Sequence, residues 1–211
     1  MMIDKILDMI GAGSKTSAAE KKLLEKELEK ILSGPPQPDL RVIGLFSDVS
    51  DDKIAELIHA LIYLDEINRI SDEERPVEFY ISTYGGSADD MFGMYDVMRV
   101  IRERTPIQTI GLGKVMSAGV LLLAAGTKGK RCIGKNCRVM VHSVIGGSHG
   151  PLHNLINEMD AIEQIQKMYS DALIAETNMT KKDLKKLLEK KVNVYLSAEE
   201  AVELGIADII I

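Results

Sequence analysis

Apolar residues recur along most of this chain with two alternating periods. Short runs of strand-like composition are each followed by a longer run with apolar residues three or four positions apart. The strand-like runs lie at residues 42–46, 77–82, 107–111 and 192–196, with two more around a turn within residues 130–142. The helical runs lie at residues 51–66, 88–102, 118–125, 152–176 and 181–190, with a last capped helix opening at Ser197. This alternation predicts an α/β fold with a largely parallel sheet, whose functional loops follow the carboxyl ends of the strands.

A separate segment precedes this pattern. The run from Ser17 to Glu20 has capping-box spacing, and apolar residues then recur on one helical face until Gly34 and two prolines end the helix. We therefore expect an N-terminal amphipathic helical arm and linker at residues 1–36 and one main domain at residues 37–211. The apolar stripe of the arm needs a cover, either from its own core or from another subunit.

Composition and charge narrow the possible classes of function. The net charge of −6, with the two signs intermixed, argues against a nucleic-acid partner. No apolar run reaches the roughly 18 residues of a membrane span, and the first residues lack the order of a secretory signal, so no membrane association is expected. Cys132 and Cys137 have no second pair to complete a zinc site, so we expect reduced thiols, no bound metal and a cytoplasmic location.

The candidate chemistry centres on a serine and a histidine. Ser117 follows a predicted strand and opens a predicted helix, and His142 closes a later strand-like run. A serine hydroxyl attacks a carbonyl only if a neighbour accepts its proton, and a neutral imidazole suits that task near pH 7. Alone, Ser117 also fits a simple helix N-cap, and His142 a structural histidine.

Two small-residue sites could complete such a centre. Gly85 and Gly86 follow a predicted strand and free backbone N–H groups, although a simple turn is the alternative interpretation. Ala118 and Gly119 place a further N–H at the positive end of a helix beside Ser117. Two such donors could stabilise a developing oxyanion.

A series of motifs then resembles one known family. The matching runs stand in the same order as in ClpP, the proteolytic subunit of the Clp protease, and the likeness covers residues 40–209. The runs are Arg41-Val42-Ile43, Tyr80-Ile81-Ser82-Thr83-Tyr84-Gly85-Gly86, Tyr95-Asp96, Ser117-Ala118-Gly119, Gly126-Thr127-Lys128-Gly129-Lys130-Arg131, Arg138-Val139-Met140-Val141-His142, Gly146-Gly147 and Leu196-Ser197-Ala198-Glu199-Glu200-Ala201.

The resemblance implies both a fold and an activity. The fold would be the ClpP/crotonase-like spiral of βαβ units, with a handle strand within residues 143–150 and a long helix after it. The activity would be serine endopeptidase, with Ser117 as nucleophile, His142 as general base, and the Gly86 and Ala118 amides as the oxyanion hole.

The resemblance also implies an assembly. Subunits would form a homo-oligomeric heptameric ring, and two rings would stack as a tetradecamer in the usual arrangement. An AAA+ Clp unfoldase would deliver unfolded polypeptides and use the ATP, so this chain would need no cofactor.

One departure limits the expected activity. Asn193 stands where the family has the third triad residue, an aspartate. An asparagine carbonyl can accept a hydrogen bond from the imidazole, but it cannot stabilise the imidazolium that forms. Val194 also replaces a usually polar residue linked to ring assembly, so the choice between one ring and two stays open.

Two alternatives follow from these observations. The chain could be a weakly active or inactive ring subunit with a structural or regulatory role beside an active paralogue. It could also be a crotonase-type acyl-CoA enzyme, a class that usually employs glutamates, although no motif places Glu103 or Glu176 beside the glycine loop.

Overall fold

A computed structural model of the chain describes residues 22, 26, 40–188 and 193–211. The chain divides into two units, Met1–Leu40 and Arg41–Ile211. Apart from Lys22 and Lys26, the expected N-terminal helix lies outside the described residues. Within the described part, no helix combines the length and the apolar character needed to cross a membrane.

The second unit is built on one mostly parallel sheet, which confirms the predicted α/β class. Among the described residues the sheet has seven strands, with β1, β2, β3, β4 and β7 in that order, β5 beside β3, and β6 antiparallel to β5. The strands are β1 (Val42–Leu45), β2 (Val77–Thr83), β3 (Ile107–Met116), β4 (Cys132–Ile133), β5 (Arg138–Val141), β6 (Val194–Leu196) and β7 (Ile209–Ile210).

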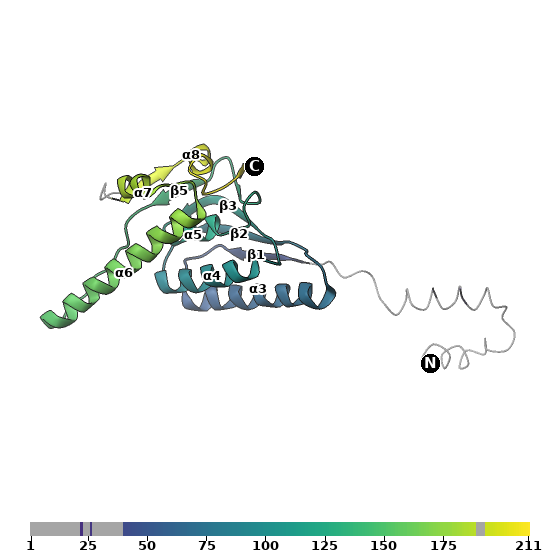
Figure 1. Ribbon diagram of the computed structural model, residues 1–211, viewed down its shortest axis with the longest axis horizontal. Helices are drawn as coiled ribbons and strands as arrows, with labels where there is room; N and C mark the ends of the chain where they lie inside the picture. Colours follow the sequence, from purple (N-terminus) through teal and green to yellow (C-terminus); the bar gives the residue numbers. More distant parts are fainter. Residues whose placement is uncertain (1–21, 23–25, 27–39, 189–192) are drawn as a thin grey trace. The chain divides into compact units, whose positions relative to one another are not determined.

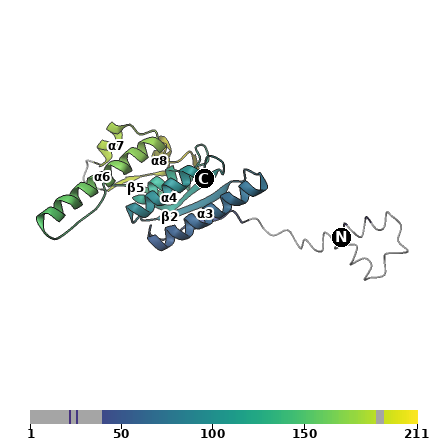
Figure 2. The same ribbon diagram turned by 60° about the horizontal axis from the view of Figure 1, so that its bottom comes forward.

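Helices connect these strands and cover the sheet. Figure 1 shows α3 and α4 side by side below it, with α5 close to the strands, and Figure 2 shows the same arrangement from another side. Every residue of α5 is buried. The helices are α3 (Asp51–Ser71), α4 (Ala88–Ile101), α5 (Ala118–Ala124), α6 (Leu152–Glu176), α7 (Lys181–Leu188) and α8 (Ala198–Glu203).

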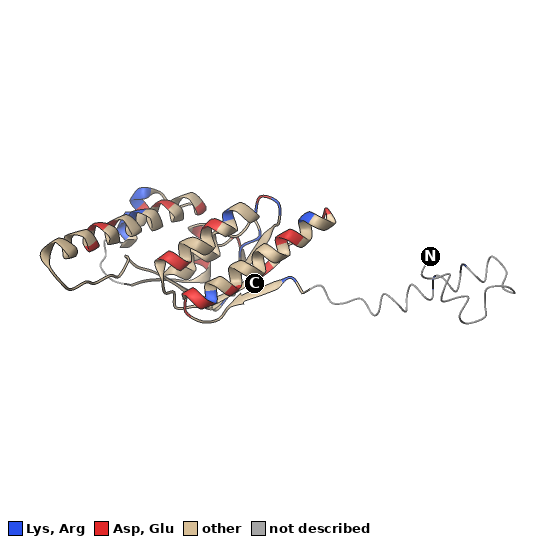
Figure 3. Cartoon of the chain, turned by 90° about the horizontal axis from the view of Figure 1, so that it is seen from below, with Lys and Arg blue, Asp and Glu red and all other residues tan. Residues whose placement is uncertain are grey.

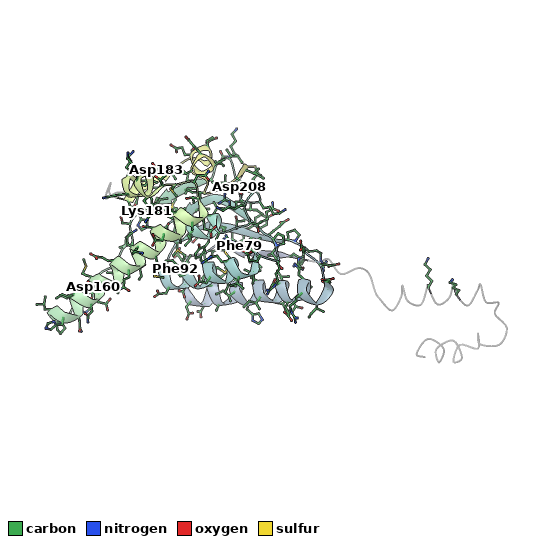
Figure 4. All side chains as sticks on the ribbon, in the orientation of Figure 1. Phe79, Phe92, Asp160, Lys181, Asp183 and Asp208 are labelled. Atoms are coloured by element: carbon green, nitrogen blue, oxygen red, sulfur yellow. The ribbon has the colours of Figure 1, made fainter. Side chains whose placement is uncertain are left out.

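The core lies between the sheet and these helices. Along β2, alternate residues are buried, as the period of two requires, and Phe79, labelled in Figure 4, is one of them. Met91, Met94 and Met98 on α4 are almost wholly buried and pack into the core. Cys132 and Cys137 are free and buried, as expected, and burial raises the pKa of the Cys137 thiol to about 11.

Several elements differ from their predicted bounds. The third strand continues past residue 111 to Met116, because its second half gains β5 as a partner through Lys114 and Arg138. The two strands expected within residues 130–142 both form, and each pairs with β3. β7, which the pattern missed, pairs with β4.

The handle strand expected within residues 143–150 is not formed in the single chain. Residues 143–150 follow β5 and form no regular secondary structure. A strand needs a neighbour to satisfy its backbone N–H and C=O groups, and no strand of the described residues lies beside this segment. This part of the expectation therefore fails for an isolated subunit.

The long helix α6 is present and extends beyond the rest of the unit. Figure 1 shows its first half projecting away from the sheet, and Asp160 labels this half in Figure 4. Only Tyr169, Ala172, Leu173 and Glu176, all in the second half, are buried. The projecting half carries acidic residues but no Lys or Arg up to Gln166 (Figure 3).

A buried ion pair fastens the end of α6 to α4. The Arg102 guanidinium donates two hydrogen bonds of 2.8 Å to the Glu176 carboxylate, and the Tyr95 hydroxyl donates a third of 2.9 Å. Burial alone would raise the pKa of Glu176, but the bonds from Arg102 outweigh it and hold that pKa below its usual value. Burial, together with the bond to Glu176, raises the pKa of Tyr95 to about 12.

We predict that Glu176→Gln destabilises the fold by about 3 kcal/mol at neutral pH, because it leaves Arg102 without its partner charge. A lowered folded pKa contributes stability above the usual value of 4.5, and this contribution disappears as the pH falls through the folded pKa. The unfolding free energies of the variant and the wild type, measured in urea, should therefore converge as the pH falls below the usual carboxyl pKa. Glu163→Gln, on the exposed face of the same helix, is the matched control. A loss equal to that of the control would contradict the prediction.

Candidate active site

Ser117 occupies a sharp turn between β3 and α5. Its φ of 53° and ψ of −122° lie in a region that residues other than glycine rarely adopt, at a cost of about 1–3 kcal/mol. The Ser117 N–H donates to the Met140 carbonyl at 2.8 Å, and the Ser117 carbonyl accepts from the Tyr169 hydroxyl at 3.0 Å. Ser117 stands at the N-cap position of α5, but its hydroxyl makes no capping hydrogen bond.

The glycine loop after β2 packs directly on this turn. A Cβ added to Gly85 would lie 2.6 Å from the Ser117 Cβ, and one added to Gly86 would lie 2.2 Å from the Val49 carbonyl oxygen. Both glycines also have positive φ, of 103° and 150°. Only glycine allows this close approach, so the loop is more than a turn at the surface.

The two residues predicted to donate to an oxyanion lie at the same cavity. The loop is held by bonds from the Val49 N–H to the Gly85 carbonyl and from the Ser87 N–H to the Val49 carbonyl, which do not use the Gly86 N–H. Ala118 is the first residue of α5, where an N–H has no partner within the helix. The residues predicted as oxyanion donors, Gly86 and Ala118, thus both line the cavity that contains Ser117.

His142 follows β5 and lines that cavity too. Its Nδ1 lies 2.5 Å from the carbonyl oxygen of Ser143. A carbonyl oxygen only accepts hydrogen bonds, so Nδ1 carries the proton of the neutral ring and Nε2 keeps its lone pair. The structure brings Ser117 and His142 to one cavity, but no hydrogen bond joins them in this conformation.

Asn193 lies one step beyond the β5–β6 ladder. The antiparallel register pairs Val141 with Val194, so the next pair along would be His142 with Asn193. Directly opposed residues of an antiparallel pair have their side chains on the same face. Asn193 is exposed, and no hydrogen bond connects it to His142 within residues 40–188 and 193–211. The Ser143 carbonyl holds the imidazole here instead.

The cavity has a volume of about 480 Å³ and walls of mixed polar and apolar character. These walls come from the glycine loop, α4, the segment after β5 and α6. Their large apolar or aromatic members are Tyr84, Met91, Val144, Ile145, Ile165 and Tyr169.

Tyr169 and Tyr84 were not predicted as site residues. Tyr169 is 4% exposed, and burial raises the pKa of its hydroxyl, which stays protonated and donates to Ser117. Nothing in the sequence marks it beyond its place, four residues after Ile165, on the inner face of a long helix. Tyr84 stood in the glycine motif, and only the fold shows that it borders the cavity.

The glutamates considered for a crotonase-type acyl-CoA enzyme do not line this cavity. Glu176 is committed to Arg102 and Tyr95, and Glu103 is exposed after the end of α4. Asp160, Asp171 and Asp183 do not line the cavity either. Within the described ranges, no group of three or more His, Cys, Asp or Glu side chains is arranged to hold a metal ion.

Comparison with known proteins places the whole second unit in one family. The family model for Clp protease matches residues 38–211. ATP-dependent Clp protease proteolytic subunit 2 of Corynebacterium jeikeium is 32% identical over 169 residues, which are 80% of this chain and 77% of that protein. ATP-dependent Clp protease proteolytic subunit 1 of Prochlorococcus marinus subsp. pastoris is 30% identical over 171 residues, 81% of this chain and 83% of that protein. With its mostly parallel sheet and this match over most of its length, the chain belongs to the Clp protease family, that of ClpP.

Proposed function

We propose that this chain is a Clp-type serine endopeptidase subunit that cleaves unfolded polypeptides. The observation that carries the proposal is the arrangement around Ser117. Its hydroxyl is free of any capping bond on a strained turn, and it shares a cavity with His142, whose Nε2 keeps a lone pair. A strained strand-to-helix turn that exposes a serine hydroxyl is a known way to present a nucleophile.

The proposed reaction follows from these groups. The Ser117 oxygen attacks the peptide carbonyl while His142 Nε2 takes the hydroxyl proton, which requires a rotation that brings the two side chains into hydrogen-bond reach. The oxyanion of the tetrahedral adduct accepts from the Gly86 and Ala118 amides. The adduct collapses as the imidazolium gives its proton to the leaving amine. Water, activated by His142, then hydrolyses the acyl ester and regenerates Ser117.

Asn193 makes reduced intrinsic activity part of the proposal. The Ser143 carbonyl, bonded to Nδ1, selects the tautomer that a general base needs. It is neutral, however, and a neutral acceptor stabilises the imidazolium less than a carboxylate does. Asn193, in line with His142 across the strand pair, can supply only another neutral acceptor.

Assembly is the second part of the proposal. Both relatives are named as ATP-dependent proteolytic subunits. We propose a heptameric ring that can stack into a tetradecamer, an AAA+ unfoldase that uses the ATP, and no cofactor on this chain. The exposed apolar side chains Leu152, Ile156 and Met159 on the projecting half of α6 support self-association, because such surface is normally covered. A cytoplasmic location fits the two free thiols.

A second candidate function is a ring subunit with a structural role. The missing hydrogen bond between Ser117 and His142 and the neutral Asn193 both favour it. The two candidates differ in whether Ser117 reacts at all.

A fluorophosphonate probe tests the proposal, because it modifies only an activated serine. We expect labelling of Ser117 in the full chain, none in Ser117→Ala, and strongly slowed labelling in His142→Ala. Asn193→Asp should raise peptide hydrolysis by at least about 10-fold and by up to about 10⁴-fold, since a carboxylate stabilises the imidazolium. Absence of labelling, with no gain in Asn193→Asp, would leave the structural role.

The glycine loop gives a further prediction. Gly86→Ala should lower the thermal midpoint and slow fluorophosphonate labelling by about 100-fold, because its Cβ would displace the loop from Val49 and move an oxyanion donor. Gly93→Ala on α4 is the matched control, since a Cβ there meets only the Ile58 side chain, at an ordinary distance of 3.9 Å. Equal labelling rates for Gly86→Ala and wild type would remove Gly86 from the proposed oxyanion hole.

A further inference from the structure

Tyr84 stands out among the residues that line the cavity. It directly precedes Gly85 and Gly86, and it is 65% exposed although its ring forms part of the wall. A tyrosine combines a large apolar ring with a polar hydroxyl, which is why tyrosines are enriched at binding interfaces.

A cation lies over this ring. The Lys114 ammonium lies 4.6 Å from the centre of the Tyr84 ring, within the range of a cation–π contact. Lys114 is on β3, three residues before Ser117. The contact therefore joins the strand that presents Ser117 to the loop that carries Gly86.

A second cation–aromatic contact lies next to the first, on the neighbouring strand β5. Arg138 on β5 is the direct partner of Lys114 across the sheet, and its guanidinium lies 4.6 Å from the centre of the Tyr195 ring. Arg138 also precedes His142 by four residues, which places the two on one face of a strand. Neither Lys114 nor Arg138 forms an ion pair with a carboxylate within the described part of the chain.

The cavity lining adds no opposing charge. No Asp, Glu, Lys or Arg is among the described residues that form it, and His142 is its one basic side chain. The potential inside the cavity then depends on charges close behind its walls, where Asp89 and Asp90 follow the lining residue Ala88 in the first turn of α4. Lys114, in contact with the Tyr84 wall, supplies a positive one.

We propose that Tyr84 and Lys114 together form a specificity determinant, in which the ring packs against a substrate side chain and the ammonium favours an acidic residue beside it. This inference rests on the proposed peptidase function. Arg138 extends the same preference along the bound chain toward His142.

Peptide binding to the full-length Ser117→Ala variant tests the preference without any turnover. Fluorescein-labelled peptides, matched except for one Glu or Lys next to a leucine, are compared by fluorescence anisotropy. We expect the Glu peptide to bind about 5-fold more tightly at low salt, and the difference to shrink in about 0.5 M salt. Adding Lys114→Met should make the two affinities equal, and Lys114→Glu should reverse their order.

Matched variants separate charge from packing. Lys114→Arg and Tyr84→Phe should keep the preference, because each retains the cation or the ring face. Tyr84→Ala should lose it. Lys135→Met, which removes an exposed lysine outside the cavity lining, should leave it unchanged. Native mass and thermal midpoint show that each variant assembles and folds like its parent.

The outcomes distinguish the two proposals. Equal binding of the Glu and Lys peptides, or a preference that survives Lys114→Met, overturns this inference and leaves the peptidase intact. Failure of every peptide to bind, together with no fluorophosphonate labelling of the wild type, overturns the proposed function and this inference with it.

Discussion

The backbone turn at Ser117 decides where the other parts of the site lie. β3 ends at Met116 and α5 begins at Ala118, so one residue must absorb the whole change of direction in a conformation that costs about 1–3 kcal/mol. The Met140 carbonyl and the Tyr169 hydroxyl hold that residue through its backbone, and the fully buried α5 prevents the turn from relaxing. Because the Ser117 backbone groups make these hydrogen bonds, the Ser117 hydroxyl is not needed to hold the turn. The same turn explains the glycine loop, since Gly85 must pack within contact distance of Ser117.

The sheet register brings His142 and Asn193 to the same end of the sheet as Ser117, but it does not complete a triad with a charged third member. β5 pairs with β3 at one edge and with β6 at the other, so Ser117, His142 and Asn193 emerge at or near the ends of three adjacent strands. The His142 imidazole nevertheless bonds to the adjacent Ser143 carbonyl, and no hydrogen bond joins it to Ser117 in this conformation. His142 is followed by residues 143–150, which form no regular structure in the single chain. The residue that would act as general base therefore leads directly into a segment without regular structure.

Much of this architecture could be predicted from local patterns, and the departures have physical causes. The strand–helix alternation predicted the α/β class. The small residues around Ser117 predicted available backbone N–H groups, and the structure adds positive φ values at Gly85, Gly86 and Ser117 that the sequence did not predict. The length of β3 could not be predicted, because Lys114–Met116 become a strand only when β5 lies beside them. The resemblance placed a strand within residues 143–150, but a strand there needs a partner that one chain does not supply. Tyr169 could not be predicted as a site residue, because its contact with Ser117 depends on the packing of α6 against α5. Sequence spacing alone does not encode that packing.

The central claim is that Ser117 and His142 act on one bound carbonyl. A peptide chloromethyl ketone tests it directly, because the serine must add to the ketone before the imidazole displaces chloride from the neighbouring carbon. Peptide mapping by mass spectrometry should find His142 alkylated at a single site in the full chain, and Ser117→Ala should abolish that modification. Alkylation of His142 at the same rate in Ser117→Ala, or adducts only at other residues such as His149 and His153, would contradict the account.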